Sequence, residues 1–212
     1  MPERSVVFVD GNNWYHSLTK LGISNLGRLN YAKVSRKLVG PREWTATRYY
    51  VGQVRQQLDT ILYSAQRRYM AWLGARDPRI SIHYGRLEQR PARNDAAAEL
   101  KRYLAELKVR IDPAVYKDLL SLAVRHAVMS VTVEKAVDVM LAVDMVRMAE
   151  RNEYDTAYLL SADGDFTPAV KAVAEKGKRV FAASATPGAQ LAQAVYKFIP
   201  LQRSWFDDCF GE

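Results

Sequence analysis

Two short apolar runs, about 150 residues apart, each end in Asp followed by Gly, and this repeated pattern strongly constrains the fold. The first run ends at Asp10-Gly11 and the second ends at Asp163-Gly164. A short apolar run that stops at a Gly-containing turn is typical of a buried strand. The carboxyl ends of the strands in a parallel α/β sheet line one crevice, so we expect both acidic ends to lie there.

Carboxylates that converge in one crevice repel one another, and each raises the pKa of its neighbours unless a cation neutralises them. Hard divalent cations prefer carboxylate oxygens as ligands. The two acidic strand ends therefore predict a Mg²⁺ or Mn²⁺ site at this edge of the sheet.

Composition limits the classes of protein that this chain can belong to. With 212 residues, 49% of them hydrophobic, we expect one main domain over residues 1–200, a basic helical region around 85–130 and an aromatic tail at 201–212. The net charge of +8 either attracts a polyanion such as nucleic acid or aids solubility, and charge alone does not separate the two.

The cysteine content and the absence of a long apolar run bear on location. Cys209 is the single cysteine, which excludes a disulfide framework and a thiolate metal site and fits a reducing cytosol. No apolar run approaches the ~20 residues that span a bilayer. We expect a cytoplasmic protein without a membrane partner.

Apolar runs alternate along the chain with stretches of helical periodicity, which predicts a mainly parallel sheet with helices on both faces. The predicted strands are 6–10, 46–51, 80–84, 155–160 and 179–183. The predicted helices begin at Asn12 or Asn13, at Tyr31, at Gln56, at Ala96, at Val133 or Glu134, at Thr167 and at Pro187. The polar segment 86–94 contains Pro91 and reads as a loop.

The helix predicted to end at Glu150 is apolar nearly all round, which indicates burial, yet it contains Asp138 and Asp144. A buried carboxylate is costly unless it is paired or binds a metal. Asp138 lies in the first turn, where either the helix dipole and Lys135 or a metal can stabilise it. Asp144 lies about 9 Å further along the helix axis and about 120° around it. There it can either form an ion pair with Arg147 or contribute to the metal site.

Ordinary structural roles can explain some of the other acids. Asp165 can cap the helix that begins near Pro168, and Asp10 can be a turn residue. Capping explains one of Asp163 and Asp165 but not both. Acids at two predicted strand ends and at the start of a buried helix together favour a metal site.

Several motifs resemble those of an NYN domain in the PIN-like nuclease superfamily, in particular its bacterial LabA/DUF88 branch. They occur in the family's order at both ends of the chain: Phe8-Val9-Asp10-Gly11-Asn12-Asn13, Lys135 to Met145, Leu160-Ser161-Ala162-Asp163-Gly164-Asp165-Phe166-Thr167-Pro168 and Gly177-Lys178-Arg179-Val180. The chain departs from the family at Ala136 and Ala162, where relatives often have Gly.

This resemblance implies a three-layer α/β/α sandwich and a metal-dependent ribonuclease site. Asp10, Asp138, Asp163 and Asp165 correspond to the family's metal-binding acids, and Asp144 falls on a position that is frequently acidic. Asn13 is expected beside the metal, as a polar contact to the substrate or to the acids. The implied activity is endonucleolytic hydrolysis of RNA.

Basic residues stand among aromatic ones in the middle of the chain, a mixture that suits single-stranded RNA because bases stack on aromatic rings and Arg binds phosphate. The candidate residues for this contact are Arg67, Arg68, Arg86, Arg90 and Arg93. The aromatic tail and the unassigned middle region can each support a homodimer.

Other functions compete with the ribonuclease. A nucleic-acid-binding or regulatory module can keep the fold and hydrolyse nothing. A phosphatase of the haloacid-dehalogenase type needs a general acid two residues after Asp10, where Asn12 stands. A Toprim-like site requires a Glu at the end of the first strand, where this chain has Asp10.

Overall fold

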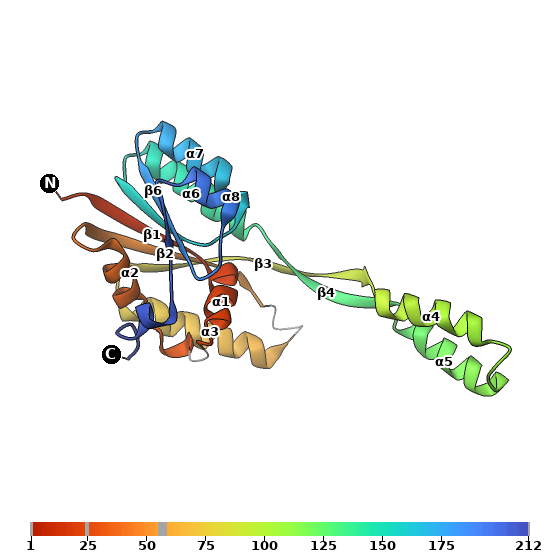
Figure 1. Ribbon diagram of the computed structural model, residues 1–212. Helices are drawn as coiled ribbons and strands as arrows, with labels where there is room; N and C mark the ends of the chain where they lie inside the picture. The colour runs from red at the N-terminus through yellow and green to blue at the C-terminus, as the bar shows by residue number, and fades with distance from the viewer. Residues whose placement is uncertain (1, 24–25, 55–58, 212) are drawn as a thin grey trace. The chain divides into compact units, whose positions relative to one another are not determined.

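The computed structural model describes residues 2–23, 26–54 and 59–211, and the side chains of residues 87–90 and 129–135 lie outside the description. Two compact units make up the chain (Figure 1). One combines Met1–Arg86 with Glu134–Glu212, and the other is Leu87–Val133. Within the described residues, no helix is both long and apolar enough to cross a membrane.

The larger unit is built on a parallel sheet, as predicted. Strands β3, β2, β1, β5, β6 and β7 lie side by side in this order, each parallel to its neighbour, and β4 lies next to β3. The strands are β1 (Arg4–Asp10), β2 (Glu43–Gln53), β3 (Ile80–Arg93), β4 (Val128–Lys135), β5 (Thr156–Leu160), β6 (Arg179–Ser184) and β7 (Lys197–Pro200).

Helices cover both faces of this sheet, which confirms the predicted three-layer α/β/α sandwich (Figure 1). One face carries α1 (Gly11–Lys20), α2 (Tyr31–Val39) and α3 (Thr60–Arg76), and the other carries α6 (Val137–Glu150), α7 (Thr167–Glu175) and α8 (Ala189–Ala194). Alternate residues of β1 serve the two cores. Val7 and Val9 join the first, and Val6 and Phe8 join the second.

The aromatic tail belongs to the core of the first face. Phe206, in the short 3₁₀ helix Arg203–Phe206, is fully buried, and its ring lies 5.9 Å from that of Trp14. Cys209 is buried as well, in the same core. The last residues therefore close the sandwich as a strap. A second 3₁₀ turn, Leu26–Arg28, precedes α2.

The smaller unit contains a helical hairpin. Its helices are α4 (Asp95–Leu107), close to the predicted 96–107, and α5 (Pro113–Arg125), which the sequence analysis left unassigned. Asp112 caps α5 and Pro113 opens it, as their residue types favour. The predicted loop 86–94 is wrong, because β3 continues to Arg93 beside β4.

The start of α6 also differs from the prediction. The helix begins at Val137 rather than at Val133 or Glu134, because β4 extends to Lys135. Between strand and helix, Ala136 adopts a left-handed conformation, with φ of 68°. Glycine adopts this conformation without the steric conflict that a Cβ creates, so Ala136 is strained.

Replacing Ala136 by Gly should therefore raise the free energy of unfolding, by about 1 kcal/mol, because the strain is removed. The matched control is Ala142→Gly in the interior of α6, which should lower it by about 1 kcal/mol. Urea denaturation measures both. A loss of stability in Ala136→Gly equal to that of the control would contradict the assigned strain.

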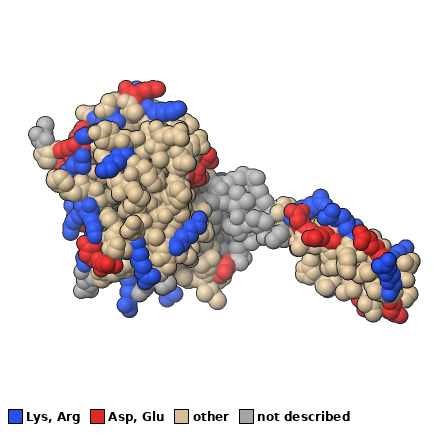
Figure 2. All heavy atoms as spheres, viewed as in Figure 1, with Lys and Arg blue, Asp and Glu red and all other residues tan. Residues whose placement is uncertain are grey.

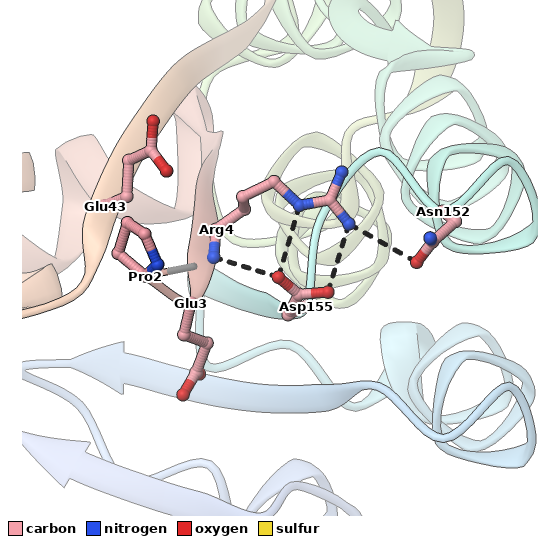
Figure 3. Close-up of a pocket in the computed structure, with 6 residues that line it drawn as sticks. All are labelled: Pro2, Glu3, Arg4, Glu43, Asn152 and Asp155. Carbon is pink, nitrogen blue, oxygen red and sulfur yellow. Dashed lines mark hydrogen bonds and ion pairs between the residues drawn. The ribbon is translucent and has the colours of Figure 1, made fainter.

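Ion pairs hold the amino ends of the strands together, opposite to the edge where the acidic strand ends lie. Arg4 at the start of β1 binds Asp155 through its backbone N–H and its guanidinium, at 3.0–3.2 Å (Figure 3). Lys178 reaches the same carboxylate at 3.3 Å. Hydrogen bonds from Arg4, and to a lesser extent from Lys178, hold the pKa of Asp155 well below its usual range.

A lowered pKa stabilises the folded state above the unfolded-state pKa of about 4, and this stabilisation is lost as the pH falls. Asp155→Asn should therefore lower the melting temperature at pH 7 and lower it much less at pH 3. Exposed Asp207→Asn serves as the control with little effect at either pH. An equal loss in Asp155→Asn at both pH values would show that charge plays no part.

Candidate metal centre

Asp10 stands at the carboxyl end of β1 and is almost completely buried, with 3% of its surface exposed. One carboxylate oxygen accepts the N–H of Asn13 at 3.2 Å and caps α1, which begins at Gly11 rather than at the predicted Asn12 or Asn13. The other accepts the hydroxyl of Ser161 at 2.9 Å. Asp10 is thus fixed between the ends of β1 and β5.

A chain of hydrogen bonds connects Asp10 to the loop after β5. The Ser161 hydroxyl that donates to Asp10 accepts the N–H of Asp163 at 3.0 Å, and an oxygen of Asp163 accepts the N–H of Asp165 at 2.9 Å. The side-chain oxygen of Asn13 accepts the N–H of Ala162 at 3.1 Å. In the structure, Asn13 positions this loop.

Gly11 allows α1 to begin directly against the sheet. A Cβ at this position would lie 2.6 Å from the carbonyl oxygen of Tyr50 and 2.8 Å from the ring of Tyr49. Neither distance is tolerable for a real carbon atom, so the residue after Asp10 must lack a side chain. The Asp10-Gly11 pair of the sequence thus reflects close packing as well as chemistry.

Asp138 lies in the first turn of α6, on the same face of the sheet as Asp10. Partial burial raises its pKa, and the negative charges of Asp163 and Asp165 raise it further. Among the described side chains, no Lys or Arg forms an ion pair with any of these three acids. The side chain of Lys135, the predicted partner of Asp138, lies outside the description.

This arrangement is compatible with a divalent cation, although it is not a closed cage. Among the described residues, no three His, Cys, Asp or Glu already stand at metal-binding spacing. Mg²⁺ keeps several of its waters and binds proteins through one or two carboxylates, so it does not require such a cage. The mutual repulsion of Asp138, Asp163 and Asp165 is what a cation would relieve.

Asp144 has a different partner from the ones that were predicted. Its carboxylate binds the guanidinium of Arg48 at 2.7 Å and accepts the hydroxyl of Tyr50 at 2.9 Å. Although burial opposes it, these two bonds lower the pKa of Asp144. Arg48 therefore takes the place of the predicted Arg147 as the partner of Asp144, and metal binding by Asp144 stays a prediction.

The predicted basic residues are not all on one unit. Arg67 and Arg68 on α3 and Arg86 on β3 are exposed in the larger unit, whereas Arg93 belongs to the smaller one and lies 3.8 Å from Asp95. The side chain of Arg90 lies outside the description.

The sequence alone did not predict the roles of three residues in this region. Ser161 is fully buried and orients Asp10, and its signal was a polar residue at the end of an apolar strand. Arg48 neutralises Asp144. His83 stacks on Tyr50 with ring centroids 4.7 Å apart, and burial together with the charge of Arg48 lowers its pKa.

Comparison with known proteins agrees with this fold. The NYN domain family matches residues 4–202. A crystal structure of a protein of unknown function from Vibrio parahaemolyticus is similar, with a TM-score of 0.53 and 14% sequence identity over 99% of this chain and 97% of that chain. At this identity the likeness concerns the fold alone. No curated protein matches the chain.

The two aspartates of α6 should respond oppositely to neutralisation. Because the pKa of Asp138 is raised in the folded state, ionisation of this carboxyl group opposes folding. The protonated group therefore stabilises the folded state at low pH, and this stabilisation is lost as the pH rises through the folded-state pKa. At pH 7 in EDTA, Asp138→Asn should raise the melting temperature. Asp144→Asn should lower it, because Arg48 loses its partner.

Divalent metal supplies a second measurement on the same proteins. Mn²⁺ should raise the melting temperature of the wild type and of Asp144→Asn relative to EDTA, and raise that of Asp138→Asn much less. Equal responses to Mn²⁺, or a loss of stability in Asp138→Asn without metal, would show that Asp138 is not an unneutralised acid.

Proposed function

Because the chain belongs to the NYN domain family of PIN-like nucleases, we propose that it is a divalent-metal-dependent endoribonuclease acting on single-stranded RNA. The observation that carries this proposal is the placement of acids from three elements at one edge of the sheet: Asp10 is fixed at the end of β1, Asp138 lies in the first turn of α6, and Asp163 and Asp165 follow β5 close enough to act on Asp138 electrostatically. Nucleases of this family typically use divalent metals. An ordinary structural role does not require unneutralised acids to converge.

Asp10, Asp138 and Asp163 are the residues that would hold Mg²⁺ or Mn²⁺, with Asp165 beside them. When bound, the metal would supply an acidified water and neutralise charge on the phosphodiester. The chain's own contribution is preorganisation. Ser161 and the N–H of Asn13 fix the carboxylate of Asp10, so little reorganisation is needed when the metal binds.

Part of the larger unit offers aromatic and basic groups that suit RNA. The guanidinium of Arg67 lies 5.9 Å from the ring centre of Tyr63, and Tyr84 acts on Arg67 electrostatically. Tyr84 is 41% exposed, two residues before exposed Arg86. Exposed rings beside Arg can stack on bases and bind phosphates without reading sequence.

A binding module without catalysis is the second candidate. The observation that favours it is the lack of a preformed group of three metal ligands among the described residues. Incubation with labelled single-stranded RNA in Mg²⁺, Mn²⁺ or EDTA separates the two functions. Binding that persists in EDTA, with no cleavage under either metal, would favour the module.

Asp10→Asn and Asp163→Asn should each reduce metal-dependent cleavage of single-stranded RNA at least 100-fold, because a neutral amide is a poor ligand for a hard cation. The fold should persist, since Asn also caps helices well through its side-chain oxygen, and its amide N–H can donate to the oxygen of Ser161 in place of the bond that Asp10 accepts. Circular dichroism checks the fold, and exposed Asp207→Asn is the matched control. Full activity in both variants would refute the assigned site.

A further inference from the structure

We propose that the hairpin of α4 and α5 is a dimerisation element, which docks on the same hairpin of a second copy of this chain to form a four-helix bundle. The proposal concerns the smaller unit by itself and is independent of the nuclease site. It identifies an interaction surface and its occupant.

The smaller unit exposes an unusual share of large apolar side chains. Of the fifteen that are exposed among the described residues, eight lie within residues 87–133. Charge distribution supports the same conclusion, since Figure 2 shows charged groups along one edge of the hairpin and an uncharged area beside them. Patches of this kind on a soluble protein mark sites of association.

Most of the exposed large apolar residues of each helix form a stripe next to the buried ones. On α4, Ala97 and Leu104 are buried, and Leu100 and Tyr103 are exposed, at 38% and 57%. At 100° per residue, the exposed pair lies about 60–120° to one side of Ala97. The helix is therefore apolar over more of its circumference than one neighbouring helix can cover.

Helix α5 shows the same asymmetry. Ala123 is buried, and Val115, Leu119 and Leu122 are exposed at 50%, 37% and 44%. Val124, exposed at 54%, lies about 100° to the other side of Ala123 and is not part of this group. Val115, Leu119 and Leu122 recur at intervals of four and three residues, so they form one stripe about 40–100° to the same rotational side of Ala123. In two antiparallel helices whose buried residues face each other, residues that are rotated by the same angle and in the same sense from those buried residues lie on the same side of the helix pair. The two stripes thus form one continuous face.

The size of this face is appropriate for a dimer. The exposed fractions correspond to roughly 500 Å² of apolar surface on each hairpin, close to the apolar share of the ~800 Å² that each partner buries in a standard interface. Pairing two such faces produces a four-helix bundle, the usual way in which helical hairpins complete their cores.

Charge favours a second copy over RNA as the occupant. Residues 95–125 contain six Lys or Arg and five Asp or Glu, so the hairpin is nearly neutral in a chain with a net charge of +8. RNA binding requires an excess of basic groups, which the hairpin lacks. Glu99 and Arg125 flank the face on α4 and α5, and a two-fold axis along the helices brings Glu99 near Arg125 of the second copy.

Sedimentation velocity over a range of protein concentrations tests the proposal on the full chain. The wild type should sediment as a dimer, and Val115→Glu with Leu122→Glu should convert it to a monomer by burying charge in the interface. The matched control is Ala114→Glu with Ser121→Glu, which places the same charges on the exposed opposite side of α5 and should remain dimeric.

Circular dichroism distinguishes dissociation from unfolding, since the helical signal should persist in both double variants. A second test replaces Glu99 by Arg, which should weaken the dimer several-fold, and Glu99→Arg with Arg125→Glu should recover most of the loss. A monomeric wild type, or a dimer that survives Val115→Glu with Leu122→Glu, would overturn the proposal. If Val115→Glu with Leu122→Glu abolishes RNA binding but leaves the sedimenting mass unchanged, the proposal is also overturned, and RNA is the occupant of this face.

Discussion

Repulsion between carboxylates at one edge of the sheet is the interaction on which this account depends. Asp138 comes from the start of a helix, and Asp163 and Asp165 come from the loop after β5. Partial burial raises the pKa of Asp138 and the two loop acids raise it further, and no described Lys or Arg neutralises the three. Two acids elsewhere in the molecule are neutralised by basic groups, since Asp144 pairs with Arg48 and Asp155 pairs with Arg4 and Lys178. Asp138, Asp163 and Asp165 have no such partner among the described side chains.

The fold supplies the framework for this repulsion. Parallel β1 and β5 end at the same edge, which places Asp10 next to Ser161. The absence of a side chain at Gly11 lets α1 start there, and its first turn holds Asp10 and Asn13 in place. A cation that relieves the repulsion would also stabilise the folded chain, so metal binding and stability are coupled at this edge.

Much of the fold could be predicted from sequence, because the strands that position the site are short, apolar and bounded by turns. The acids at their ends follow from the geometry of a parallel sheet. The partner of Asp144 could not be predicted, since Arg48 lies 96 residues away along the chain and the local alternative Arg147 is equally plausible. The segment 86–94 is polar and contains Pro91, so only its pairing beside β4 explains why it is a strand. Ser161 was overlooked because a lone serine at a strand end has many structural roles.

Anomalous diffraction from a crystal soaked in Mn²⁺ would locate the ion itself among the carboxylates at this edge of the sheet. The account predicts a peak whose ligands include carboxylate oxygens of Asp10 and of Asp138 or Asp163. A structure without a peak at this edge, or with a lysine or arginine side chain among these carboxylates, would contradict it.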